Sequence, residues 1–270
     1  MSTLRYNGHS AHYLDSGRGD TVVLLHAGAS SSRQWKKMSA ELPRSYRLLA
    51  PDLIGFGETP AWYGERELTH DDQAELVLAL IKAQAAGAVD LVGHSYGGAT
   101  AIRTVLSAPE LVRRLVLIEP IMMPLLPQAG KQAEFDEYER VAQRFIKEAD
   151  AGRDKEAMSF FIDHRNGPGT WAASSDETRT RLLAVSRQTA DGFRSNLNNP
   201  TTLADCNTIR APTLVICGAT TTEPERLVTE ILEAYLPNCR CELVAEAGHM
   251  SPLTHPGEIA RLVDEHLAAS

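Results

Sequence analysis

Ser95 stands in the pattern Gly-x-Ser-x-Gly, which spans Gly93–Gly97. Residues 89–92 before it have strand character, and residues 99–106 after it are typical of a helix. A serine at the apex of a tight strand-to-helix turn projects its hydroxyl away from the backbone, and the helix N-terminus favours a developing negative charge. The pattern therefore predicts a nucleophilic serine. The alternative, weighed on the motif alone, is a glycine-rich turn with an exposed serine.

A nucleophilic serine needs a base, and His249 is the best placed of the nine histidines. It follows the last predicted strand in a Gly-His turn, late in the chain. There its imidazole would take the proton of Ser95 and return it to the leaving group. A lone histidine is more often a structural residue, which is how we interpret His26 and His94, and His255 before a proline is expected at a helix entry.

The composition limits the classes of function. The chain has 270 residues, 43% of them hydrophobic, which is enough for one large α/β domain with an insertion or for two small domains. A net charge of −8 argues against a nucleic-acid partner. No apolar run has membrane-spanning length, and the first residues lack the apolar segment of a signal peptide. We expect no membrane association and a cytoplasmic location.

The four cysteines support the same expectation. They are Cys206, Cys217, Cys239 and Cys241. The last two are too close in sequence for an ordinary disulfide, and no paired Cys-x-x-Cys framework for zinc is present. Reduced thiols in a cytoplasmic protein are therefore expected, without a metal or another cofactor.

Strands and helices alternate along most of the chain. Strands are predicted at residues 4–6, 11–14, 21–26, 46–50, 89–92, 115–118, 212–218 and 241–244. Thr69 and Asp72 form a capping-box pattern at the start of one of the helices between them. Other helices are predicted at 223–235 and 257–267. The alternation indicates a parallel sheet with helices on both faces and active residues at the carboxyl ends of its strands.

The rhythm changes between residue 121 and about residue 206. Strands disappear, and amphipathic patterns predict helices at 135–150, 155–164 and 176–193. We interpret this stretch as a lid over the carboxyl ends of the strands.

Several of these segments together resemble the α/β-hydrolase superfamily over nearly the full length. They are the His26 loop, Pro51–Gly57, the turn at Ser95, Pro212–Val215 and Ala247–His249. The resemblance implies a mostly parallel eight-stranded sheet with helices on both faces and a helical cap inserted after the sixth strand. It implies a core of residues 1–120 and 207–270 and a cap of residues 121–206.

A narrower resemblance rests on overall likeness and on two stretches, Phe161–Trp171 and Leu117–Pro120. There the chain is similar to bacterial, metagenome-derived esterases and N-acyl-homoserine lactonases of this fold. In such enzymes an oxyanion hole stabilises the intermediate, and here it would consist of the backbone N–H groups of Gly28 and Tyr96. One residue departs from the pattern, because Ala27 stands where the family usually has glycine.

The acid of the triad is the second departure. The family usually places it three residues after the glycine that ends the seventh strand, and this position is Thr221. Glu223, two residues further on, is one substitute, although it also suits the start of a helix. Glu119, at the end of the preceding core strand, is the other, and it is the acid that we predict.

The predicted substrate pocket comes from the start of the cap and its aromatic residues. Ile121–Met123 leave the sheet beside Glu119, and methionines are adaptable partners for a flexible acyl chain. The pocket is assigned to Met122, Met123, Phe145, Phe160 and Trp171, while Phe161 and Phe193 also punctuate the cap helices. Ordinary packing between cap and core is the alternative for any of them.

The expected function is hydrolysis of carboxylic esters without a metal. The expected substrates are N-acyl-homoserine lactones, whose lactone ring would be opened, and the expected role is quorum quenching. The partner would be a small-molecule ester or lactone, and the protein a monomer or homodimer. A metal-dependent lactonase would need a His-x-His-x-Asp-His cluster, which His9–His12 does not supply. A general carboxylesterase, a cofactor-free dioxygenase and a non-catalytic binding protein of this fold remain alternatives.

Overall fold

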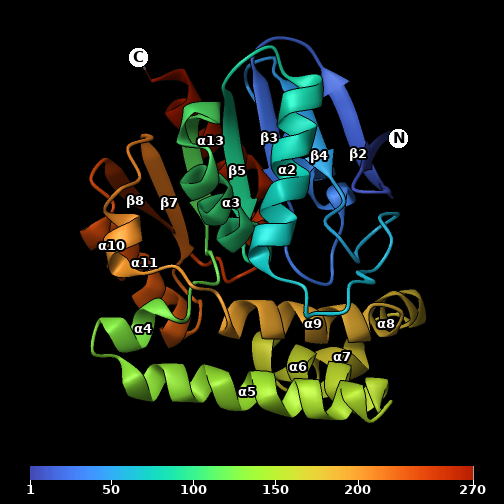
Figure 1. Cartoon of the computed structure of the whole chain (residues 1–270). Helices are drawn as coiled ribbons and strands as arrows, with labels where there is room; N and C mark the ends of the chain where they lie inside the picture. The colour runs from blue at the N-terminus through green and yellow to red at the C-terminus, as the bar shows by residue number, and fades with distance from the viewer. Residues whose placement is uncertain (270) are drawn as a thin grey trace.

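A mostly parallel, eight-stranded sheet forms the centre of the molecule in the computed structural model, which describes residues 1–269 and, for His9, the backbone (Figure 1). The strand order is β1-β2-β4-β3-β5-β6-β7-β8, and only the pairs β1–β2 and β2–β4 are antiparallel in this described part. Every predicted strand is present. The strands are β1 (Ser2–Tyr6), β2 (His9–Gly17), β3 (Thr21–Leu25), β4 (Arg47–Pro51), β5 (Val89–His94), β6 (Val112–Ile118), β7 (Thr213–Gly218) and β8 (Cys239–Val244).

Alternate residues of the central strands pack on opposite faces of the sheet. In β3, Val23 and Leu25 belong to one hydrophobic cluster, and Val22 and Leu24 belong to another. The first face is covered by α2 (His70–Gln84), α3 (Tyr96–Ser107) and α11 (Glu223–Tyr235). The second is covered by η1 (Ser32–Trp35), α1 (Lys36–Ala40) and α13 (Pro256–Ala268). Burial on both faces explains why these strands are continuous apolar runs.

The helix that begins after Thr69 has the predicted capping box. The Thr69 side chain accepts the N–H of Asp72, and the Asp72 carboxylate accepts the N–H of Thr69. Two of the unpaired donors at the N-terminus of α2 are therefore satisfied. This fixes the start of the helix that packs most closely against α3.

Seven helices lie between β6 and β7 in the described chain, and the larger ones form a layer below the carboxyl ends of the strands (Figure 1). They are α4 (Leu125–Gln128), α5 (Gln132–Asp150), α6 (Asp154–Asn166), α7 (Thr170–Ala173), α8 (Asp176–Leu183), α9 (Ser186–Leu197) and α10 (Leu203–Cys206). We call this layer the cap. The division of the chain at residues 120 and 206 stays a prediction.

The single helix predicted over residues 176–193 is wrong, because α8 ends at Leu183 and α9 begins at Ser186. Neither Ala184 nor Val185 is a helix breaker, so the sequence pattern runs through the break. Both residues line the cavity described below. The break therefore reflects the packing of the cap over the core rather than local propensity.

Helix α5 is the longest element of the cap and is strongly amphipathic. Its buried residues are Tyr138, Ala142 and Phe145, while most of its other side chains are polar. Within residues 1–269, no helix has both the length and the apolar character that crossing a membrane requires.

Candidate active site

Ser95 occupies a strained backbone conformation between β5 and α3. Its φ is 56° and its ψ is −116°, a region that non-glycine residues rarely adopt. A Cβ at Gly97 would lie 2.3 Å from the carbonyl oxygen of Leu25, so only glycine fits there. The Ser95 N–H donates to the carbonyl of Ile118 at 2.9 Å, which ties the turn to the end of β6. The Gly-x-Ser-x-Gly pattern thus forms the predicted turn.

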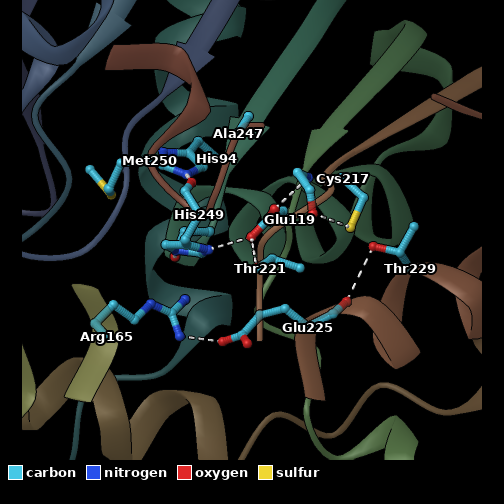
Figure 2. Close-up of polar contacts among 12 residues, drawn as sticks. His94, Glu119, Arg165, Cys217, Thr221, Glu225, Thr229, Ala247, His249 and Met250 are labelled. Atoms are coloured by element: carbon cyan, nitrogen blue, oxygen red, sulfur yellow. Dashed lines mark hydrogen bonds and ion pairs between the residues drawn. The ribbon is translucent and has the colours of Figure 1, made fainter. Parts of the chain in front are cut away.

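The imidazole of His249 connects Ser95 with Glu119. Its Nε2 lies 2.8 Å from Ser95 Oγ. Its Nδ1 lies 2.7 Å from Glu119 Oε2, the contact that Figure 2 shows. The carboxylate can only accept, so Nδ1 carries the proton and Nε2 is left to accept the serine hydroxyl. This is the orientation that a general base for Ser95 requires.

Glu119 is fully buried and makes three hydrogen bonds. Its Oε1 accepts the N–H of Gly218 at 2.7 Å, and its Oε2 accepts the hydroxyl of Thr221 at 2.7 Å as well as His249 Nδ1 (Figure 2). The residue follows β6 with a φ of 43°. These contacts hold the carboxylate against the imidazole.

Glu223, the alternative acid, lies elsewhere. Its side chain is 56% exposed and forms an ion pair with Arg226 one turn further along α11, at 2.6 Å. The structure therefore brings Glu119, and not Glu223, to His249. The helix-start interpretation of Glu223 agrees with its position at the first residue of α11.

A buried ion pair lies close to His249. Arg165 of α6 pairs with Glu225 of α11, and their side chains are 12% and 1% exposed (Figure 2). Burial lowers the pKa of His249 well below its ordinary value, and the charge of Arg165 acts in the same direction while that of Glu225 opposes it. The imidazole is therefore neutral near pH 7, as a base must be.

Sequence reasoning missed this pair. Arg165 stands at the end of a helix and Glu225 at the start of another, which are positions where such charges simply favour the helix dipole. Sixty residues separate them, and no local pattern links them.

The proposed oxyanion donors lie at the cavity between Ser95, His249 and the cap, which is described below. Gly28 and Tyr96 both line it, and a Cβ placed on Gly28 would lie 3.7 Å from Tyr96 Cβ. The N–H of Ala27 is already donated to Gln34 Oε1 at 3.1 Å. Within this loop the arrangement favours Gly28 over Ala27 as the donor, and its role stays a prediction.

Gln34 and His94 form a link that the sequence did not indicate. Gln34 Nε2 donates to His94 Nδ1 at 3.0 Å, and His94 Nε2 donates to the carbonyl of His249 at 2.8 Å. Burial lowers the pKa of His94 to about 3, so it is neutral.

His26 donates to the Ala27 carbonyl and accepts the N–H of Leu53. Both histidines thus hold loops around the site.

A cavity of about 610 Å³ lies between Ser95, His249 and the cap. Its apolar lining comes from both the cap and the core, where Phe56, Met250 and Leu253 contribute. The cap side includes Tyr138, Phe161, Leu182, Val185 and Phe193, and Ile121 lies between the sheet and the cap. Charged residues, including Arg33, Glu58 and Arg181, also contribute to the wall.

The predicted pocket residues do not line this cavity, which corrects the assignment. Met122 and Met123 are buried in the core, with exposed fractions of 1% and 0%. Phe145 supports the wall from behind, 5.6 Å from the ring of Phe161 and 5.2 Å from that of Phe193.

The other two predicted pocket residues also point elsewhere. Phe160 lies under the guanidinium of Arg144, whose Cζ is 3.7 Å from the ring centroid, and Trp171 is buried within the cap. A helix turns about 100° per residue, so Phe160 and its neighbour Phe161 face different directions. The sequence pattern could not say which one faces the core.

Within residues 1–269, no three His, Cys, Asp or Glu side chains are grouped in a way that could hold a metal ion. The four cysteines are free thiols, and Cys206 and Cys217 are buried.

Comparisons with known proteins define the class. Residues 22–262 match the model of the alpha/beta hydrolase family. The 2-hydroxymuconate semialdehyde hydrolase of Pseudomonas sp. (strain CF600) is 27% identical over 94% of this chain and 89% of its own. A pimeloyl-(acyl-carrier protein) methyl ester esterase of Nitrosomonas europaea is 24% identical over 94% of this chain and 98% of its own.

Solved structures share the same fold. An alpha/beta hydrolase from a Medee basin deep-sea metagenome library superposes with a TM-score of 0.82 at 20% identity, covering 100% of this chain and 98% of that one. A thermophilic esterase from Thermogutta terrifontis gives 0.77 at 22% identity, covering 98% and 96%. The chain belongs to the alpha/beta hydrolase family. It is a hydrolase with the fold that the sequence predicted.

Proposed function

We propose that the protein is a serine esterase that uses Ser95 as nucleophile, His249 as base and Glu119 as acid. The observation that carries this proposal is the continuous hydrogen-bonded chain from Ser95 Oγ through His249 to Glu119. Similarity to a methyl ester esterase supports it. All three residues of the proposed triad come from one chain.

The proposed reaction has two halves. Ser95 Oγ attacks the ester carbonyl while His249 Nε2 takes its proton, and Glu119 stabilises the imidazolium that forms. The N–H groups of Gly28 and Tyr96 would hold the oxyanion. His249 then protonates the leaving alkoxide, and a water molecule, activated by the same imidazole, releases the acid from Ser95.

We propose acyl-homoserine lactones as the natural substrate class, which would make the protein a quorum-quenching lactonase. The cavity of about 610 Å³ has an apolar wall that suits an acyl tail. Attack at the lactone carbonyl opens the ring and gives the open-chain acyl-homoserine. Mass spectrometry of the purified protein with an acyl-homoserine lactone tests this proposal. Cleavage of simple esters with the lactone left intact, or release of free homoserine lactone, would leave only the esterase.

Hydrolysis of a carbon–carbon bond is the second candidate, because two similar proteins are named 2-hydroxymuconate semialdehyde hydrolases. The same serine machinery would then act at the aldehyde carbonyl of the semialdehyde instead of at an ester carbonyl. A parallel assay with 2-hydroxymuconate semialdehyde and simple esters separates the two. Turnover of the semialdehyde at a much higher kcat/KM than any ester or lactone would favour this candidate.

A further inference from the structure

A cluster of buried polar side chains lies beside the cavity, outside the proposed triad. His70 of α2 and Thr100 of α3 belong to the core, and Tyr138 of α5 and Asn196 of α9 belong to the cap. Tyr138 and Asn196 are only 8% and 7% exposed, and both line the cavity. The ring of His70 lies 4.5 Å from that of Tyr96, the residue next to the nucleophile.

The hydrogen bonds of this cluster form a chain. Tyr138 Oη lies 3.1 Å from Asn196 Nδ2, and Asn196 Oδ1 lies 2.8 Å from His70 Nε2. His70 Nδ1 lies 3.0 Å from Thr100 Oγ1, which is 3.1 Å from the carbonyl oxygen of Tyr96. Among the described residues, the polar atoms of these four side chains have no other hydrogen-bond partner.

The cluster has more donor hydrogens than contacts to use them. Burial lowers the pKa of His70 to about 4, so it carries one N–H at neutral pH. The hydroxyls of Thr100 and Tyr138 add one donor each, and the amide of Asn196 adds two. That is one donor more than the contacts in the chain.

At least one donor hydrogen of Tyr138 or Asn196, which both line the cavity, has no acceptor within this chain of contacts, whichever way the amide is turned. If Asn196 Nδ2 donates to Tyr138, the hydroxyl hydrogen of Tyr138 and the second amide hydrogen are both unused. If the amide is reversed, Tyr138 donates to Asn196 and Asn196 donates to His70, and the second amide hydrogen is still unused. A bound acceptor would satisfy a donor that the protein itself leaves without a partner.

We propose that Tyr138 and Asn196 bind an uncharged carbonyl oxygen in the part of the substrate held under the cap. A carboxylate fits less well, since the donors are neutral and the nearby cation, Arg165, is already paired with Glu225. This proposal rests on the proposed function, because it concerns the substrate cleaved at Ser95. An acyl-homoserine lactone carries such an oxygen in its amide, and a plain alkyl ester does not.

The test compares 4-nitrophenyl heptanoate with its oxo analogues, which carry a ketone at successive carbons of the chain. At one position we expect the ketone to raise kcat/KM about tenfold or more over the plain ester, mainly through KM. Tyr138→Phe and Asn196→Leu should each bring this ratio toward one. Tyr46→Phe is the matched control, because it removes a buried hydroxyl that donates to Asp264 on the opposite face of the sheet. It should keep the ratio.

The outcomes separate this inference from the proposed function. If esters are cleaved but no ketone position is preferred, or if both cavity variants keep the ratio, the carbonyl site is refuted and the esterase stands. If no ester is cleaved, the esterase fails, and binding of the same ester pairs to the Ser95→Ala protein is measured by calorimetry. Equal Kd values for every pair then overturn the carbonyl site as well. The comparison on the unmodified cavity does not depend on whether a variant folds.

Discussion

The hydroxyl of Thr221 donates a hydrogen bond to Glu119 Oε2 at 2.7 Å. Thr221 occupies the position where the resemblance places the acid of the triad. In the proposed triad the carboxylate comes from the end of β6 instead of the loop after β7, and the residue at the usual position donates a hydrogen bond to it. The same oxygen of Glu119 accepts His249 Nδ1, so the threonine acts directly on the proposed triad.

Glu119→Gln should lower kcat by about a thousandfold or more, with a much smaller effect on KM. The change keeps the shape but removes the charge that stabilises the imidazolium. The matched control is Glu223→Gln, which makes the same chemical change at an exposed position paired with Arg226. Steady-state kinetics on a chromogenic ester gives the comparison. The opposite ranking of the two variants would place the acid after β7.

Thr221→Val should lower kcat about tenfold, because it removes one hydrogen bond to a charged acceptor. Thr221→Ser keeps the hydroxyl and is expected to retain most of the activity. Kinetics on the same ester, with thermal unfolding as a check on stability, measures both. Equal activity of the valine and serine variants would show that the hydroxyl does not support Glu119 in the reaction.

Ser95→Ala should reduce ester hydrolysis by several orders of magnitude with the fold intact. A serine-directed phosphonate should label Ser95 alone, as peptide mass spectrometry would show. Ser107→Ala is the control and should keep full activity, because Ser107 is exposed at the far end of α3, the helix that begins directly after Ser95. Near-native turnover by the Ser95 variant would refute the proposed mechanism.

The pH profile should respond to the ion pair beside His249. Activity rises as the imidazole loses its proton, so a lowered pKa places the acid limb of kcat/KM below pH 6.5. Glu225→Gln leaves the charge of Arg165 uncompensated and should move this limb to lower pH. Arg165→Met removes the charge and should move it to higher pH.

Breaking a buried pair costs about 3–5 kcal/mol, so these profiles need a temperature at which circular dichroism shows folded protein. Arg226→Met, in the exposed pair on the same helix, is the control and should not move the limb. Shifts of Glu225→Gln and Arg165→Met in the same direction would contradict this account.

Phe161→Ala should shift the acyl-length optimum toward longer chains, since it removes part of the cavity wall. Phe160→Ala is the matched control, one residue away, where the ring packs on Arg144 outside the cavity. A series of 4-nitrophenyl esters of increasing length gives both optima. Each added methylene contributes up to about 0.8 kcal/mol while there is room to bury it. An unchanged optimum in the first variant would mean that the tail lies elsewhere.

The sequence predicted the sheet, the turn at Ser95 and the residue that contacts His249, because each has a local signal. Ser95 sits in a motif in which Gly93 and Gly97 allow the tight turn. Glu119 follows β6, which pairs directly with β5, the strand that leads into Ser95. The pocket had no such signal. Whether Phe160 or Phe161 faces the core depends on how α6 docks, and the burial of Met122 depends on how the chain turns after β6.

The polar contacts beside the cavity could not be predicted for a related reason. Arg165 and Glu225, like Tyr138 and Asn196, come from helices far apart in the sequence and meet only once the cap is folded. A single sequence shows each of them as an ordinary polar residue on an amphipathic helix. Their contacts are significant because they are buried, and burial is a property of the tertiary structure.

The backbone bonds between Ser95 and the end of β6 have a consequence for heat inactivation. The Ser95 N–H donates to the carbonyl of Ile118, and the Ser95 carbonyl accepts the N–H of Ile121. The segments that carry Ser95 and Glu119, at the ends of β5 and β6, are therefore held together by backbone hydrogen bonds. His249 follows the edge strand β8, and its carbonyl is held by His94. On warming, His249 is expected to lose its contacts with Ser95 and Glu119 while the sheet is still folded. Loss of turnover would then precede melting, and cooling would restore it.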